Sequence, residues 1–268
     1  MKGVFMVKSV HLFRFKITPP DDVLLTDFHQ HEQGSLFIPI FGNLSIHLED
    51  HLFISPKGCS TWIPARTEHR AQAIGVAEGV KLFVNDKLHK LPDHPCSINI
   101  TELSRALIKD LSSKDDKELN MSFQQMKIKV LIKELEQSID FNPYSIALFK
   151  DHRIQFLHKE MMRAPEKKIP LKVWANQIGM SERNLSRLIK KDIGMTFSQW
   201  KNQLYMFLAL KELLRGKSIQ NISISLGYES DSSFIYQFKK TFGNSPMQYL
   251  KKQNEKYNIK LQHHKIIS

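Results

Sequence analysis

Three histidines in the first third of the chain are placed so that they could act together. His29 and His31 are two residues apart, and His69 follows the segment Trp62-Ile63-Pro64. Alternate residues of a strand point to the same side, so we expect His29 and His31 to face one way, where His69 from a later strand can converge with them inside a barrel. Three imidazoles suit Zn, Ni, Cu or Fe. The triad is therefore a candidate site for a small molecule or a divalent metal, and polar packing inside the barrel is the alternative.

A second set of functional side chains lies in the basic last third of the chain. Residues 166–260 contain 17 Lys and Arg against 7 Asp and Glu, which leaves +10 of the net charge of +12. Clustered Lys and Arg displace counterions from phosphates, so the charge favours a polyanionic partner. The side chains that we expect to contact DNA, as donors and acceptors for base edges and phosphates, are Arg183, Ser186, Arg187, Lys190, Ser232, Ser233, Tyr236 and Lys239.

An internal repeat indicates how these side chains are positioned. Residues 190–200 recur 49 positions later, and residues 171–179 recur 48 positions later. Each copy predicts a short helix, a glycine turn, and a second helix that begins after Ser181 or Ser230 and ends at Gly194 or Gly243. This is the helix-turn-helix plan, and its second helices would span about 181–192 and 230–241. Four aromatic residues that belong to the repeat or lie between its copies are expected in the core: Trp200, Phe207, Phe242 and Tyr249.

A helix from about residue 197 to 215 is expected to join the two copies rigidly. Its apolar stripe contains Leu204, Phe207, Leu208 and Leu214. A fixed separation of roughly 34 Å would let both second helices enter successive major-groove segments on one face of the duplex.

The rest of the chain predicts an α+β protein. Short apolar runs broken by turn residues indicate a small β-domain, and helical spacing begins near Thr101. We expect a β-domain at residues 1–95, a helical connector at 96–164, the DNA-binding domain at 165–255 and a basic tail at 256–268. Two apolar stripes in the connector must be buried somewhere, within the chain or in a two-fold dimer through residues 123–135. Their members are Leu103, Leu107, Leu111, Phe123, Met126, Val130, Leu131 and Leu135.

Residues 169–250 resemble the DNA-binding domain of the AraC/XylS family of bacterial regulators. The second copy carries that signature in Leu226-Gly227-Tyr228, Phe238-Lys239-Lys240 and Ser245-Pro246, among other positions. The chain departs from the family at Tyr205, where arginine is usual, and at Ser223, where alanine is usual. The resemblance implies an all-α domain with two helix-turn-helix motifs that reads double-stranded DNA in a sequence-specific way.

Residues 28–84 resemble the cupin barrels, including those that serve as sensor domains in some AraC-type regulators. The resemblance rests on His29-Gln30-His31, Trp62-Ile63-Pro64 and the final His69. It implies a ligand-binding barrel with a possible divalent metal, although Ser35 occupies the position of the usual glutamate ligand and Glu32 is a poorly placed substitute.

The function expected from these features is a ligand-responsive transcriptional regulator, not an enzyme. A metal-dependent cupin enzyme and a non-specific nucleic-acid-binding protein are the alternatives. Expected partners are duplex DNA, a small-molecule or metal effector, RNA polymerase and a second copy of the chain, and no cofactor is required. The two cysteines, Cys59 and Cys96, and the lack of a long apolar run favour a reduced protein in the cytoplasm, with no membrane association.

Overall fold

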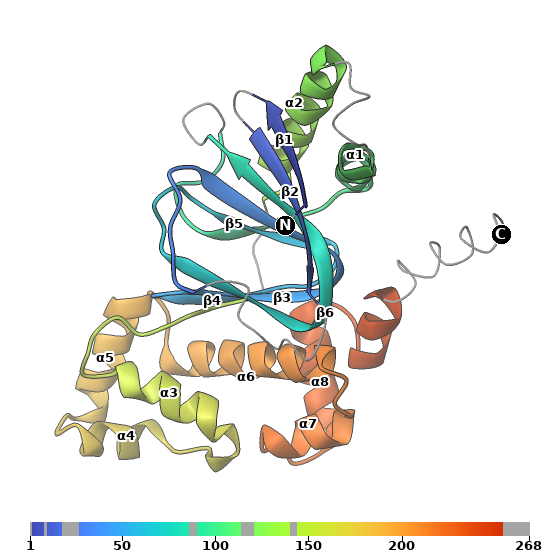
Figure 1. Cartoon of the computed structure of the whole chain (residues 1–268). Helices are drawn as coiled ribbons and strands as arrows, with labels where there is room; N and C mark the ends of the chain where they lie inside the picture. The colour runs from blue at the N-terminus through green and yellow to red at the C-terminus, as the bar shows by residue number, and fades with distance from the viewer. Residues whose placement is uncertain are drawn as a thin grey trace. The chain divides into compact units, whose positions relative to one another are not determined.

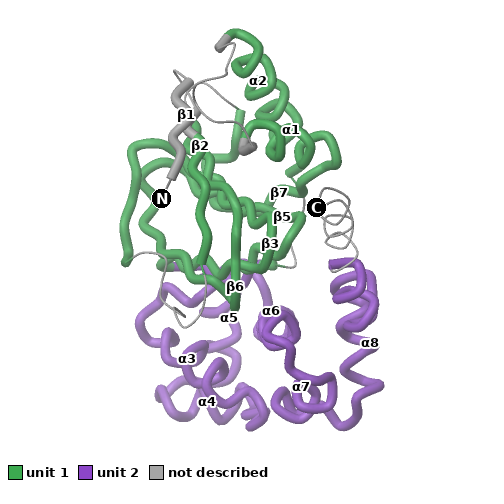
Figure 2. Tube along the Cα trace, turned by 45° about the vertical axis from the view of Figure 1, so that its right-hand side comes forward, with its two compact units in different colours: residues 1–49, 53–144 green, residues 50–52, 145–268 purple. Residues whose placement is uncertain are grey.

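The computed structural model describes residues 2–7, 10–17, 27–85, 90–113, 121–139 and 144–253. The expected tail at 256–268 lies outside these residues. The chain divides into two units, residues 1–49 with 53–144 and residues 50–52 with 145–268 (Figure 2). The helices that follow the β-strands therefore belong to the first unit, together with the sheet. The boundaries expected at residues 95 and 164 stay predictions.

The first unit is an antiparallel sheet with two helices (Figure 1). The long strands β3 and β6 pair along most of their length, β2 lies beside β6, and β5 joins β3 to β7. The strands are β1 (Lys2–Val7), β2 (Val10–Ile17), β3 (Gly34–Leu48), β5 (Cys59–Ile63), β6 (His69–Val84) and β7 (Cys96–Asn99), with β4 (His51–Ser55) divided between the two units. The helices are α1 (Glu102–Ser113) and α2 (Met121–Gln137).

A sharp change of register bends β3 against β6 between Pro39 and Asn43. Gly42 lies at this point with a φ of +68°, and a Cβ there would approach the carbonyl oxygen of Val76 to 1.9 Å. Only glycine fits a left-handed backbone this close to another strand. The bend lets one face of the two strands become concave.

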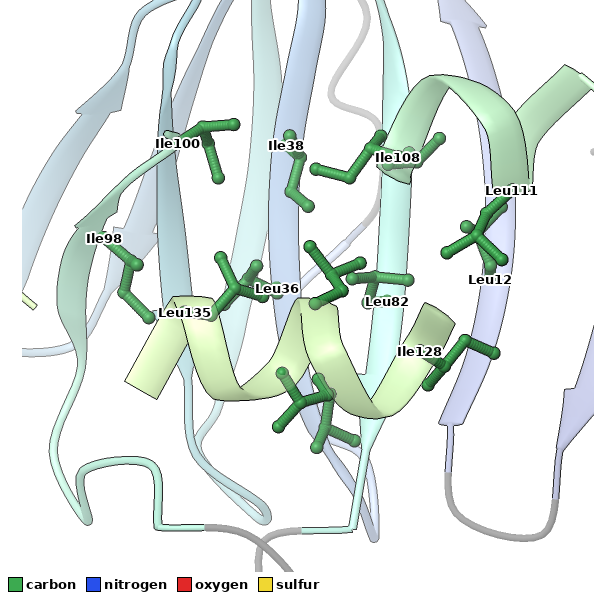
Figure 3. Packing of buried hydrophobic residues seen from close by; sticks show 14 of the residues in the cluster. Leu12, Leu36, Ile38, Leu82, Ile98, Ile100, Ile108, Leu111, Ile128 and Leu135 are labelled. Carbon is green, nitrogen blue, oxygen red and sulfur yellow. The ribbon is translucent and has the colours of Figure 1, made fainter. Parts of the chain in front are cut away.

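The opposite face of these strands packs against α1 and α2 (Figure 3). Leu36 and Ile38 of β3 and Leu82 of β6 are buried with helix residues such as Ile128 and Leu135. Because strand residues alternate between faces, the residues between them point the other way, toward the concave side. The other face carries a second apolar core, which includes Phe37, Leu44 and Phe53, and a polar cluster lies beside Phe37 on that face.

The prediction of two buried apolar stripes on these helices was partly wrong. Leu111, Leu131 and Leu135 are buried, but they share the sheet-facing side with isoleucines of both helices. Helix α2 carries apolar residues on two sides, and only one side can meet the sheet. Four members of the expected stripes are 45–54% exposed: Leu103, Phe123, Met126 and Val130.

The second unit is mainly helical and confirms the repeat. The first copy contains α4 (Leu171–Gln177) and α5 (Glu182–Ile193), and the second contains α7 (Ile219–Ser225) and α8 (Asp231–Phe242). Helix α6 (Phe197–Leu214) joins them, as expected (Figure 1). Strand β8 (Ser145–Ala147), α3 (Gln155–Arg163) and a single 3-10 turn (Pro165–Lys167) precede the copies, and residues 246–253 are helical. The expected α+β fold class, with a β-rich first part and two helix-turn-helix motifs, is confirmed.

Two further findings concern the chain as a whole. Within the described residues, no helix is both long and apolar enough to cross a membrane. Cys59 and Cys96 are both reduced, and burial raises the pKa of Cys96 to about 11.

Candidate nucleic-acid interface and histidine triad

Helix α5 is defined by local signals at both ends and by its buried face. The Ser181 side chain accepts a hydrogen bond from the Asn184 backbone N–H at 3.2 Å, which caps the helix. Gly194 ends the helix with a φ of +75°. Leu185 and Ile189 are completely buried, so the other side of the helix faces outward. The four site residues predicted on this helix, Arg183, Ser186, Arg187 and Lys190, are exposed there.

Helix α8 repeats this construction. The Ser230 side chain accepts from the Ser233 N–H at 3.2 Å, and Gly243 again has a φ of +75°. Phe234 and Phe238 are completely buried at the positions that match Leu185 and Ile189. The predicted residues Ser232, Ser233, Tyr236 and Lys239 are exposed, and Tyr236 is 70% exposed. A phenol left so exposed adds nothing to the core, which is consistent with a surface that meets a partner.

The helix between the copies is stiffened by its cap and its burial. The Thr196 hydroxyl and the Gln199 side chain form a capping box at its start. Trp200 is completely buried, packs on Phe149 with ring centroids 4.5 Å apart, and donates to the Ala147 carbonyl at 2.7 Å. Phe207 and Tyr249 are also buried, as expected, whereas Phe242 is only partly buried.

Tyr205, which stands where the resemblance predicts an arginine, anchors helix α6. Tyr205 is buried on α6, and its hydroxyl donates to the Pro165 carbonyl at 2.7 Å. This bond ties the long helix to the turn that precedes α4. Ser223 is 2% exposed on α7. Its small side chain suits a close helix crossing.

The three predicted histidines of the first unit lie together. Their ligand nitrogens are all within 4.8 Å of one another, and the ring centroids of His29 are 4.7 Å from those of His31 and of His69. The backbones of His29 and His69 also exchange two hydrogen bonds, at 3.0 and 2.9 Å. The expected strand placement was wrong, because His31 lies in an irregular segment before β3 and His29 forms only an isolated bridge.

Backbone contacts determine which nitrogen of two histidines carries the hydrogen. His29 Nδ1 lies 2.7 Å from the Asp27 carbonyl, and His69 Nδ1 lies 2.8 Å from the Thr67 carbonyl. A carbonyl oxygen only accepts, so both Nδ1 atoms must be the donors. A neutral ring with its hydrogen on Nδ1 keeps the lone pair of Nε2. Among the described residues, none forms a hydrogen bond with the buried Nε2 of His69.

Lys81 is a fourth polar side chain of this cluster and was not among the predicted site residues. Lys81 lies on β6 opposite Phe37 of β3, and its Nζ is 2.9 Å from His31 Nε2. The strand pattern held a signal for it, since Lys81 is the single charged residue between Val80 and Val84. Its alternation with buried Leu82 places it on the concave face of the sheet.

Burial keeps His31 and His69 neutral at physiological pH. Burial lowers the pKa of His31 to about 4, with further lowering from the charges of Lys81 and His29. Burial also lowers the pKa of His69 to about 4, against the opposing hydrogen bond to Thr67. The pKa of Lys81 is lowered by burial to about 8, which still leaves mainly an ammonium at pH 7. The cluster thus combines the uncharged imidazoles of His31 and His69 with one cation.

The two residues considered as oxygen ligands contribute differently. Glu32 is exposed and binds Arg66 at 2.9 Å, so it is not a member of the triad. Ser35 is 1% exposed, and its Oγ makes no hydrogen bond with the described residues. Ser35 pairs with Phe83 in the sheet, which places its side chain on the same concave face as Lys81.

Comparisons with known proteins agree with the helical repeat. A helix-turn-helix domain model matches residues 174–252. The chain is 32% identical over 236 residues to the HTH-type transcriptional regulator NimR of Escherichia coli K12, which covers 88% of this chain and 86% of NimR. It is 21% identical over 234 residues to LumQ of Photobacterium leiognathi, a probable transcriptional regulator, which covers 83% of this chain and 91% of LumQ.

Solved structures show a more distant likeness. ToxT of Vibrio cholerae aligns over 91% of this chain and 98% of its own, with 11% identity and a TM-score of 0.37. The sequence relationship to NimR extends through both units, and the helix-turn-helix match covers both α5 and α8. The chain therefore belongs to the AraC/XylS family of transcriptional regulators, and it is a DNA-binding regulator of transcription.

Proposed function

We propose that α5 and α8 are the two recognition helices and that they enter successive major-groove segments of one DNA site. The observation that carries the proposal is the matching exposure of eight polar and charged side chains on two equivalent helices. Helix α6 has 18 residues, which corresponds to about 27 Å at 1.5 Å per residue. A buried connecting helix of this length supports a fixed separation between α5 and α8.

The two helices differ in chemistry, which makes an asymmetric site the expectation. Arg183 and Arg187 on α5 suit bidentate contacts to guanine or to phosphate. At the equivalent positions α8 carries Ser232 and Tyr236, which are uncharged. The first half-site should therefore depend more on guanine and on salt than the second.

The test is to select duplex sites with the full chain and then to scramble one half-site at a time. Either change should weaken binding, and Lys190→Ala and Lys239→Ala should weaken it through the matching halves. Lys129→Ala is the matched control, because it removes one exposed charge from the first unit instead. Equal affinity for selected and random DNA would contradict the proposal and would favour non-specific binding.

We further propose that the first unit senses an effector and that His29, His31 and His69 hold a divalent transition-metal ion. Two features support the fit. The triad offers three imidazoles close together, and backbone carbonyls orient two of the rings, as the hydrogen-bond partners of metal ligands do. The buried, unpartnered Nε2 of His69 supports a ligand more directly, since an unsatisfied polar atom is costly.

DNA affinity measured with and without Zn²⁺ tests the effector role. We expect the affinity to change with Zn²⁺ in the wild type and to be insensitive to it in His31→Ala. The His31→Ala variant should still bind its site, because the recognition helices belong to the other unit. An unchanged metal response in that variant would rule out the triad.

We also propose that the exposed side of α2 binds a second copy of the chain. Phe123, Met126 and Val130 follow the spacing of one helix face and are 45–54% exposed. Two identical apolar faces cover each other in a two-fold pair. Light scattering should show a dimer that Val130→Asp dissociates. Leu131→Asp is unsuitable for this test, since Leu131 is 1% exposed and belongs to the core.

A further inference from the structure

The concave face of the sheet holds a cation of the chain itself against the histidine triad. Lys81 Nζ donates to His31 Nε2 at 2.9 Å. The same ammonium lies 4.5 Å from the ring centroid of Phe37 and 4.7 Å from that of Phe83. Aromatic faces stabilise a cation at these distances. Three separate contacts therefore hold the lysine charge at the triad.

This position conflicts with a metal ion at His31. An imidazole nitrogen binds a metal through its lone pair, and the Nε2 lone pair of His31 already accepts the Lys81 hydrogen. The ammonium and a divalent ion also repel each other, and the repulsion is stronger in a partly buried site than in water. A metal ion can use all three imidazoles only after Lys81 has left His31.

The described part of the chain does not neutralise this lysine locally. Among the described residues, no carboxylate forms an ion pair with Lys81, and Glu32, next to His31 in sequence, binds Arg66 instead. We propose that Lys81 is a built-in competitor for the metal ion, so that the triad exchanges between a lysine-bound and a metal-bound state. This inference rests on the proposed metal effector.

The exchange between the lysine-bound and metal-bound states would let the metal ion change the conformation of the rest of the first unit. Lys81 and Phe83 lie on the concave face of β6, and the neighbouring residues Val80, Leu82 and Val84 pack in the core beneath α1 and α2. An effector shifts a conformational equilibrium only through contacts that differ between two states. Displacement of Lys81 from His31 and the two rings supplies such a difference on the strand that supports α2.

Calorimetric titration of the full chain with ZnCl₂ tests the competition. Lys81→Met removes the charge and keeps an unbranched apolar side chain for the Phe37 and Phe83 rings, while Lys81→Arg keeps the charge. Each protein is also titrated with His69→Ala added, so that zinc bound elsewhere can be subtracted. We expect Lys81→Met to bind zinc at the triad about tenfold or more tightly than the wild type, and Lys81→Arg to show no gain. Lys81→Gln is a second neutral variant in case Lys81→Met does not fold.

Three outcomes would overturn the inference. Weaker zinc binding in Lys81→Met would make Lys81 a ligand instead of a competitor. Unchanged binding would show that its contact with His31 does not oppose the metal. No zinc binding at the triad in any variant would remove both the competitor and the metal effector. DNA binding is measured on the same samples, so a failure at the triad is distinguishable from a failure of groove reading by α5 and α8.

Discussion

Arg187 gives the sharpest test of how α5 faces DNA. It is exposed in the middle of the helix, while Leu185 and Ile189 on the other side are completely buried. Arginine and alanine are both strong helix formers, so Arg187→Ala should change the free energy of unfolding by less than about 0.5 kcal/mol. A loss of DNA affinity can therefore be assigned to the interface.

The size of the loss depends on what the guanidinium contacts. A base-edge contact is worth about 1–3 kcal/mol, which weakens binding about 5- to 150-fold. The loss should be confined to one base position, and the preference there should relax. A phosphate contact would instead weaken all sequences alike and reduce the slope of log affinity against log salt by about one.

The assay is fluorescence anisotropy on the selected site and its single-base variants, over a series of salt concentrations. Thermal unfolding of each protein verifies that the fold is intact, and Lys129→Ala again serves as the charge-matched control. Unchanged affinity and salt slope in Arg187→Ala would refute the assignment of this helix face to DNA. A uniform loss across all sequences would refute base reading by this residue.

Three further predictions concern stability and are measured by urea unfolding. Gly42→Ala should reduce the free energy of unfolding by about 3 kcal/mol or more, because its Cβ would meet the Val76 carbonyl. Gly75 has a φ of +73° but open space around it, so Gly75→Ala should reduce it by about 1 kcal/mol. Equal losses would contradict the close approach at Gly42. Ser230→Ala should cost about 1 kcal/mol and weaken DNA binding, since it removes the cap of α8; an unchanged midpoint would show that the cap contributes nothing. Burial, with a further contribution from the charge of Lys159, lowers the pKa of His158. The stability gained from the neutral form of His158 is therefore complete above its unfolded pKa of about 6.5 and is lost as the pH falls below that value. His158→Leu should reduce the loss of stability in acid, and identical pH profiles would contradict this.

The second unit was largely predictable because its signals are local. Ser181 and Ser230 cap helices, Gly194 and Gly243 end them, and the offset between the copies was correct to the residue. Each of these features depends on a few neighbouring residues. The expected joining helix at 197–215 likewise agrees with Phe197–Leu214, since its cap and its apolar run are both readable from sequence.

The first unit was less predictable because its site depends on distant pairings. His69 reaches His29 through an isolated bridge, and the concave face follows from the bend between β3 and β6. The helical spacing of the sequence identified the apolar residues on α2, but it did not predict which of the two apolar sides packs against the sheet. The histidines were found by residue type, whereas Lys81 was missed because a single lysine in a strand carries no meaning until its partner strand is known.

The buried joint formed by α6 also has a consequence for how target promoters can change over time. One base pair inserted between the half-sites turns the second half-site by about 36° and moves it by about 3.4 Å. A helix anchored by Trp200 at its start and by Tyr205 in its first half provides no hinge to follow such a shift. A single-base change removes only the contact at one position. The base sequence of this regulator's operators should therefore vary during evolution, while the spacing between the half-sites stays constant. A genome search for its targets should therefore hold the gap constant and let the flanking bases vary.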